Sequence, residues 1–225
     1  MAEFHRFSDP EEVAEHLAAR VASLLQQGLV ERGAASLVVP GGRTPGLFFS
    51  KLSDSPLPWE RIKITLSDER WVDEDSPDSN AALMRRTLLR GSAMLAGFVP
   101  LYTGATSPSE GLAEAERRVA TLPRPFDAVV MGMGDDGHFA SLFPGEPALE
   151  VGLDLSATAL CVPAKGPAGG PPRLSLTLAA LAKTRHIFIL ATGEKKRAVW
   201  EAPGDLPASA LQRLTGVPVD FLWCP

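Results

Sequence analysis

The residues best suited to acid–base chemistry stand in one stretch, Gly132-Met-Gly-Asp-Asp-Gly-His138. Histidine is the side chain that most readily accepts and releases a proton near neutral pH. Asp136 precedes His138 by two positions in a glycine-rich turn, so its carboxylate could orient the ring or stabilise its charge. His138 is therefore the candidate proton carrier, and a purely structural histidine is the alternative.

The same stretch matches the dinucleotide-binding pattern GxGxxG, but its context disagrees with that function. Asp135 and Asp136 fill the variable positions and would repel a pyrophosphate, and Pro144-Gly145 interrupts the long helix that should follow. A metal site has equally little support, because no second histidine stands at ligand spacing from His138. We therefore expect no nicotinamide cofactor and no metal ion.

A second set of residues suits the binding of an anion. The turn before Pro45, a residue favoured in the first turn of a helix, contains Gly41, Gly42, Arg43 and Thr44. Its backbone N–H groups could meet an anion at a helix N-terminus, although a turn without a ligand explains the glycines equally well. Three cationic side chains could anchor the same anion: Arg70, Arg173 and Lys196. The alternative for each is a solvated surface charge, the usual fate of lysine and arginine.

The elements that must position these residues alternate between strands and helices. Short apolar, β-branched runs predict strands at residues 36–39, 62–66, 98–102, 126–131, 160–163 and 186–191. Helical spacing and capping residues predict helices from Ser8 or Asp9 to Gly33, from near Pro45, at residues 80–89, 110–120 and 174–182, and from Gly193 towards Glu201. This alternation favours one α/β domain over residues 1–225, a three-layer sandwich around a mostly parallel, Rossmann-like sheet.

Four polar clusters fall directly after predicted strands, at residues 41–44, 68–70, 134–138 and 193–196. In open parallel sheets, ligands bind in the crevice at the carboxyl ends of the strands, so the clusters should meet at one site. The alternative is that every strand end needs turn residues. The need for turn residues explains the glycines better than it explains the Asp-Glu-Arg, Asp-Gly-His and Lys-Lys groups.

Composition restricts the partners of this chain of 225 residues. With 22 Lys and Arg against 27 Asp and Glu, its formal net charge is −5, which argues against binding to nucleic acid or an anionic membrane. Cys161 and Cys224 are far apart, which favours a reducing compartment. There is no signal-like start and no apolar run of about 20 residues. We expect a cytoplasmic monomer or small homo-oligomer.

Taken in order, the clusters resemble the 6-phosphogluconolactonase family, and the resemblance covers nearly the whole chain. Its most specific stretch is residues 132–145, GMGDDGHFASLFPG. Supporting stretches are residues 67–71 with Ser79-Asn80, residues 173–177 and residues 193–196. Pro40 and Phe139 depart from the family pattern. The resemblance implies hydrolysis of 6-phosphoglucono-1,5-lactone to 6-phosphogluconate in the pentose phosphate pathway, and a fold shared with glucosamine-6-phosphate deaminases.

The resemblance also implies roles for the site residues. His138 would act as general base on the water that attacks the lactone carbonyl, with Asp136 at the acidic position of the same motif. Arg70 would steer the substrate or its developing charge. The remaining substrate and phosphate positions are Gly41, Gly42, Arg43, Thr44, Asp68, Arg173 and Lys196. The alternatives are an aminosugar-phosphate deaminase or isomerase on the same fold, and a sugar-phosphate sensor without catalysis.

Overall fold

The computed structural model describes residues 2–42, 44–166 and 170–225. Its main sheet has seven strands, and every neighbouring pair runs parallel. In spatial order the strands are β1 (Ala2–Arg6), β10 (Val219–Cys224), β9 (Ile187–Thr192), β6 (Ala128–Gly132), β2 (Ala35–Val39), β3 (Ile62–Leu66) and β5 (Gly97–Val99). The interior strand β2 is buried along its whole length, as expected for a parallel sheet covered on both faces.

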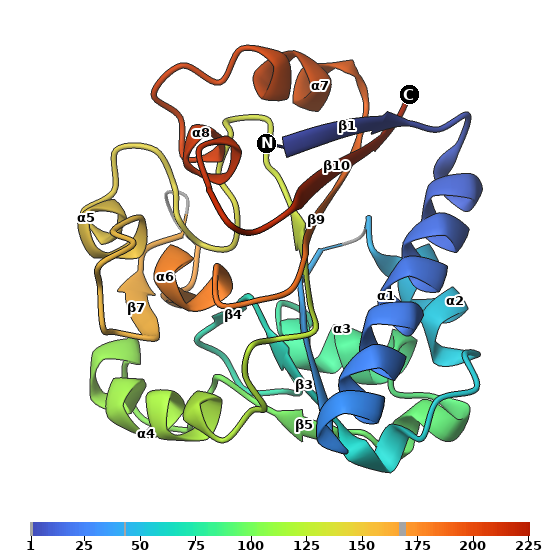
Figure 1. Cartoon of the computed structure of the whole chain (residues 1–225). Helices are drawn as coiled ribbons and strands as arrows, with labels where there is room; N and C mark the ends of the chain where they lie inside the picture. Colours follow the sequence, from blue (N-terminus) through green and yellow to red (C-terminus); the bar gives the residue numbers. More distant parts are fainter. Residues whose placement is uncertain (1, 43, 167–169) are drawn as a thin grey trace.

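The helices form a layer on each side of this sheet (Figure 1). On one side lie α1 (Pro10–Arg32) and α2 (Gly46–Ser53), with α3 (Asn80–Thr87) packed against α2. On the other side lie α4 (Pro108–Ala120), α5 (Ala148–Gly152), α6 (Leu178–Leu181) and α8 (Ala208–Gln212). Helix α7 (Glu194–Glu201) follows β9, and two short 3₁₀ helices span Trp59–Arg61 and Gly91–Leu95. The expected three-layer α/β architecture is confirmed.

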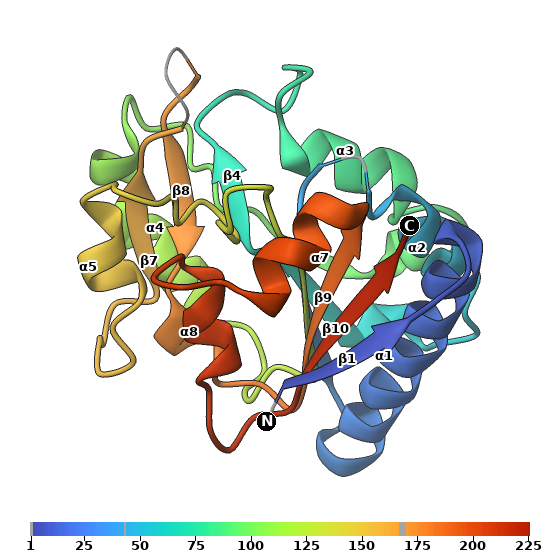
Figure 2. The ribbon, with the colours of Figure 1, turned by 90° about the horizontal axis from the view of Figure 1, so that it is seen from above.

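A second, antiparallel sheet lies beside α4 and α5 (Figure 2), and of its three strands the sequence predicted only the one at residues 160–163. Its order is β4 (Asp68–Arg70), β8 (Arg173–Leu176) and β7 (Cys161–Ala164). The helix predicted at residues 174–182 is therefore wrong in its first half, where a strand lies between two partners. Thr177 ends that strand and caps the short α6, accepting a hydrogen bond from the Ala180 N–H at 3.2 Å.

The order of the main sheet creates a topological switch point between β2 and β6. From β2 the chain builds outward through β3 and β5, and it then returns to the other side of β2 as β6. The loops that leave the carboxyl ends of β2 and β6 therefore diverge and leave a crevice between them. The predicted clusters at residues 41–44 and 134–138 belong to these two loops.

Other elements differ from the predictions in smaller ways. Asp9, the alternative to Ser8, is the cap of α1: its carboxylate accepts from the Glu12 N–H at 2.9 Å. Strands β1 and β10 were not predicted, although β10 is fully buried and β1 pairs with it along five residues. Across the described residues, we find no helix with the length and apolarity needed to span a membrane.

Candidate active site

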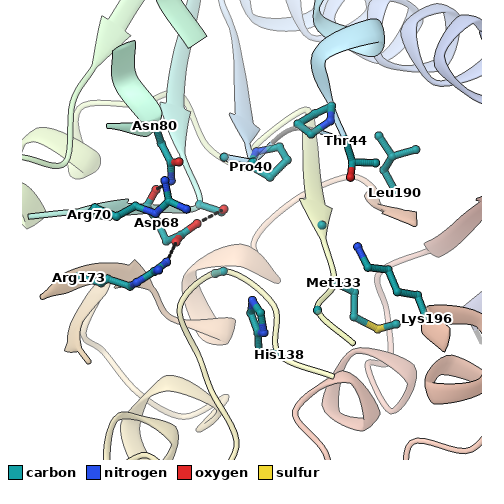
Figure 3. A pocket seen from close by; sticks show the side chains of 17 residues that line it. Pro40, Thr44, Asp68, Arg70, Asn80, Met133, His138, Arg173, Leu190 and Lys196 are labelled. Atoms are coloured by element: carbon teal, nitrogen blue, oxygen red, sulfur yellow. Dashed lines mark hydrogen bonds and ion pairs between the residues drawn. The ribbon is translucent and has the colours of Figure 1, made fainter. Parts of the chain in front are cut away.

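A pocket of about 330 Å³ opens at the carboxyl ends of the main-sheet strands (Figure 3). It brings together eight of the ten residues that the sequence singled out: Gly41, Gly42, Thr44, Asp68, Arg70, His138, Arg173 and Lys196. Asp136 does not line the pocket but bonds to His138, and Arg43 lies outside the described residues. The convergence expected from the strand ends is therefore found in the structure.

His138 is fixed by contacts on two sides of its ring. Its Nδ1 lies 2.6 Å from the Asp136 Oδ1, and its ring centroid lies 4.3 Å from that of Phe143. Partial burial acts to raise the pKa of Asp136, but the hydrogen bonds and charge of His138 outweigh it and hold that pKa below its usual value. When the neutral ring donates Nδ1–H to Asp136, Nε2 is the nitrogen that can accept a proton.

The loop that carries His138 is a tight turn and not a nucleotide-binding loop. The Gly134 N–H donates to the His138 carbonyl at 2.9 Å, and the Gly137 N–H donates to the Gly134 carbonyl at 3.0 Å. A Cβ at Gly134 would lie 2.2 Å from His138 Nδ1, so the ring can occupy its place only against glycine. After His138 no helix begins until Ala148, which agrees with rejection of the dinucleotide pattern. Phe139, the departure from the family pattern, is a buried core residue.

One wall of the pocket, here called the arginine wall, comes from the small sheet. Arg70 on β4 and Arg173 on β8 are register partners, and Figure 3 shows their side chains on the same side of the pocket. Burial lowers the pKa of Arg173, although the nearby carboxylate of Asp68 opposes this change. Two positive charges opposite one another on adjacent strands repel each other. An anion bound in the pocket beside both guanidinium groups would relieve this repulsion.

Asp68 ties the arginine wall to the loop of His138. Its Oδ2 accepts from the Ser141 hydroxyl at 2.5 Å and lies 3.8 Å from Arg173 Nη1, and its Oδ1 accepts from the Ser67 hydroxyl at 3.0 Å. Because the carboxylate is buried and engaged on both oxygens, it serves to hold these groups in place. Asp68 also lines the pocket.

The facing wall, here called the lysine wall, comes from loops of the main sheet. Thr44 follows β2, and Lys196 stands in the first turn of α7 after β9. Figure 3 shows both of them across the pocket from Arg70 and Arg173, with His138 between the two sides. The sequence grouped Arg173 with Lys196, whereas the structure places these two cations on opposite walls.

Asn80, at the start of α3, lines the pocket and was not among the predicted site residues. Its Nδ2–H donates to the Asp68 carbonyl at 2.9 Å, while its Oδ1 is buried and has no hydrogen-bond partner among the described residues. A Cβ at Gly41 would lie 1.9 Å from this Oδ1, so the glycine turn and the amide are packed together. The Ser79-Asn80 pair of the family resemblance was the signal that could have identified it.

Glu69 holds Asn80 in position from beneath the pocket. Its carboxylate accepts from the backbone N–H groups of Arg70, Asn80 and Ala81, each at 2.8 Å. Burial nevertheless raises the pKa of Glu69 to about 7. A single buried acid thus fixes both the start of α3 and the backbone of the arginine wall.

Comparison with known proteins gives a consistent answer. A sequence model described as glucosamine-6-phosphate isomerases/6-phosphogluconolactonase matches residues 8–218. A 6-phosphogluconolactonase of Pseudomonas putida is 40% identical over 224 residues, covering 98% of this chain and 92% of the relative. The chain belongs to the glucosamine-6-phosphate isomerase/6-phosphogluconolactonase family. The family resemblance of the sequence motifs is thereby confirmed.

Other members of this family agree in sequence and fold. A 6-phosphogluconolactonase of Pseudomonas aeruginosa is 46% identical over 191 residues, which cover 85% of this chain and 80% of the relative. A crystal structure of a 6-phosphogluconolactonase from Shewanella baltica superposes with a TM-score of 0.95 at 36% identity, covering 100% of this chain and 98% of the other. A monomeric glucosamine-6-phosphate deaminase, 19% identical with a TM-score of 0.77, shares the fold alone over 98% of this chain and 97% of its own.

Proposed function

We propose that this chain hydrolyses 6-phospho-D-glucono-1,5-lactone to 6-phospho-D-gluconate, in the pentose phosphate pathway. The observation that carries the proposal is the position of His138, bonded to Asp136, between two cationic walls of one pocket. A lactone is an activated ester, so its hydrolysis needs a positioned water, a base and a group that stabilises the oxyanion. The names of the relatives support the same substrate.

His138 serves as the base in this mechanism. Asp136 accepts from Nδ1–H, so Nε2 takes a proton from the water as the water oxygen attacks the lactone carbonyl. The imidazolium formed in this step is stabilised by the adjacent carboxylate. When the ring C–O bond of the intermediate breaks, the proton passes from Nε2 to the leaving oxygen, which becomes a hydroxyl of the product. Asp136 is a positioning residue, because it acts through His138.

The arginine wall holds the end of the substrate where charge develops. The guanidinium groups of Arg70 and Arg173 are preorganised by the β4–β8 register and by Asp68, so they need little rearrangement when the carbonyl oxygen becomes negative. The same pair suits the carboxylate of the product, which a planar guanidinium can bind through two hydrogen bonds.

The lysine wall holds the phosphate. Thr44 offers a hydroxyl, Gly41 and Gly42 offer close approach to the backbone, and Lys196 offers a point charge at the N-terminal end of α7. Phosphate binding far from the reacting carbon supplies energy that places the carbonyl beside His138. Arg43 belongs to the same turn by sequence and is proposed as part of this end of the site.

A deaminase or isomerase acting on an aminosugar phosphate is the second candidate, because it shares the family and the fold. The segment after His138 disfavours it. Residues 141–144 are Ser-Leu-Phe-Pro, and the ring of Phe143 packs on His138 where a carboxylate would be needed for a longer proton relay. A sensor without catalysis would need the two cationic walls but not the Asp136–His138 pair.

Three parallel assays separate these functions. Freshly prepared 6-phosphogluconolactone is followed by proton release against its spontaneous hydrolysis, glucosamine 6-phosphate is followed by ammonia release, and equilibrium binding is measured with 6-phosphogluconate. We expect rapid lactone hydrolysis and no ammonia. Binding of 6-phosphogluconate without acceleration of hydrolysis would overturn the proposal in favour of a sensor.

A further inference from the structure

We propose that Glu3, His5 and Asp220 form a second site, which binds a divalent transition-metal ion such as Zn²⁺ at the edge of the main sheet. The three side chains bring one ligand atom each to within 4.8 Å of one another. One imidazole nitrogen and two carboxylate oxygens are a donor set that zinc accepts, and a water can complete four-coordinate geometry. Two negative charges match the charge of the ion.

The register of the strands brings these donors together. Glu3 on β1 and Asp220 on β10 are Cα partners in a parallel pair, so their side chains project from the same face. His5 follows Glu3 by two residues and therefore shares that face. Figure 2 shows β1 and β10 side by side, with the start of β1 and the start of β10 at the same end. The site thus spans two chain segments more than 200 residues apart.

The distances suit a metal site better than a hydrogen-bonded cluster. His5 Nε2 lies 3.7 Å from Glu3 Oε2 and 3.6 Å from Asp220 Oδ1. Both distances exceed the usual hydrogen-bond range, which ends near 3.2 Å. Ligands placed about 2.0–2.1 Å from a tetrahedral zinc ion lie roughly 3.4 Å apart. His5 Nε2 is also buried as an atom and has no hydrogen-bond partner among the described residues.

His186 supplies an independent observation that points to the same place. Its side chain is only 9% exposed, and its Nε2 is 2.9 Å from Asp220 Oδ2 yet has no partner in hydrogen-bond geometry. Its ring is held by stacking on Phe188, with centroids 4.2 Å apart. The ring thus stands beside Asp220, where metal sites have the neighbours that position their ligands.

A further imidazole stands beside this cluster on α1, where the ring centroid of His16 lies 6.4 Å from that of His5.

The site lies away from the lactone pocket and should not take part in hydrolysis. Glu3 and Asp220 are the second residues of their strands, whereas the pocket is at the carboxyl ends of the main-sheet strands. A bound ion would instead connect the edge strand β1 to β10. Since an ion that binds the folded state alone stabilises it, zinc should raise the melting temperature.

The test uses the full chain without a histidine tag. Zinc binding is measured by calorimetry in excess Mg²⁺, together with the melting temperature and the visible absorption of Co²⁺ in the same site. We expect one zinc ion at this site, with affinity reduced about tenfold or more in His5→Gln and in Glu3→Gln. His16→Gln is the matched control on the same face and should keep wild-type affinity.

His138 is a second possible zinc ligand, so each titration is repeated in a His138→Gln background. Zinc that persists in His5→Gln but disappears with His138→Gln would place the ion in the pocket and overturn the proposal. Absence of zinc binding by the wild-type chain would overturn it as well. Lactone hydrolysis by His5→Gln should equal that of the wild type, which shows that this variant is folded.

Discussion

The two walls of the pocket are built in different ways. The arginine wall presents Arg70 and Arg173 from paired strands of the small sheet, where Asp68 restrains one guanidinium and the Asp78 carbonyl accepts from Arg70 Nη1 at 2.6 Å. The lysine wall presents a glycine turn after β2 and one lysine in the first turn of α7. Strand register therefore fixes the arginine wall, whereas the starts of helices fix the lysine wall.

This difference suits the two ends of a phosphosugar lactone. A developing oxyanion is best stabilised by groups that are already in position, because reorganisation costs energy at the moment of reaction. A phosphate is a dianion throughout the reaction, so it can be held by backbone N–H groups and a flexible lysine. The comparison therefore predicts that changes in the arginine wall alter the chemical step, while changes in the lysine wall alter substrate preference.

The largest effect should come from His138, which lies between the walls. In His138→Gln, kcat/KM should fall by about 10²–10⁴-fold for both 6-phosphogluconolactone and gluconolactone, because general-base catalysis is lost for either substrate. The ratio of the two values should stay as in the wild type. Binding of 6-phosphogluconate, measured by calorimetry, should also persist. A variant with near-normal turnover would remove His138 from the mechanism.

Substituting one residue in each wall tests the division directly. Lys196→Ala should reduce the preference for the phosphorylated lactone about tenfold or more, since charge-assisted hydrogen bonds contribute roughly 1.5–3 kcal/mol. Lys195→Ala, which removes the adjacent exposed lysine, is the matched control and should leave the preference unchanged. The measurement is kcat/KM for both lactones.

Arg70→Lys and Arg173→Lys are the corresponding variants of the arginine wall. Each keeps a positive charge but loses the planar fork, so kcat should fall on both lactones with little change in preference. If Arg173→Lys instead loses the preference as Lys196→Ala does, then Arg173 belongs to the phosphate end, as the sequence first suggested.

The lysine wall could be predicted from the sequence, and the arginine wall only in part. Glycine turns and helix starts are local signals, so Gly41, Thr44 and Lys196 could be placed at strand ends from their neighbours alone. The pairing of β4 with β8 joins residues about 100 positions apart, and residues 174–182 carry an apolar pattern that fits a helix. Tertiary pairing overrode that pattern, and no local signal could place Arg173 opposite Arg70.

Asn80 contacts parts of both walls, and its loss should have a smaller effect. Its Oδ1 has no hydrogen-bond partner among the described residues and is buried against Gly41, so a small movement of that turn would let it accept a hydrogen bond from a sugar hydroxyl. A neutral hydrogen bond contributes about 0.5–1.5 kcal/mol, so Asn80→Ala should lower kcat/KM roughly 3- to 10-fold. The effect should appear mainly in KM. An unchanged KM would show that Oδ1 does not meet substrate.

Glu69, beneath the arginine wall, should give stability a pH dependence. Its pKa is about 7 in the folded chain and near 4.5 when exposed, so the folded state holds more protons between these values. The free energy of unfolding should therefore fall as pH rises from about 4.5 to 7, by up to about 1.4 kcal/mol per pH unit from this group. Denaturant titrations across this pH range should show that the free energy of unfolding falls less steeply with pH in Glu69→Gln than in the wild type. The exposed Glu60→Gln is the control and should keep the wild-type slope.

The smallest effect concerns the segment that joins His138 to the arginine wall. Ala140 lies between His138 and Ser141, lines the pocket, and has a φ of 48°, the only positive value at a non-glycine residue among those described. A left-handed backbone costs alanine roughly 1–2 kcal/mol and costs glycine almost nothing, while glycine loses more entropy on folding. Ala140→Gly should therefore stabilise the chain slightly, by about 0.5 kcal/mol, or about 1–2 °C in melting temperature.

Ala113→Gly provides the opposite case for Ala140→Gly, because Ala113 is exposed within α4 and has no such strain. There the same substitution should destabilise the chain by about 1 kcal/mol. If relief of strain loosens the segment from His138 to Ser141, Ala140→Gly should also lower kcat. The preference for the phosphorylated lactone should then stay intact. Equal destabilisation by the two substitutions would mean that Ala140 holds no strain.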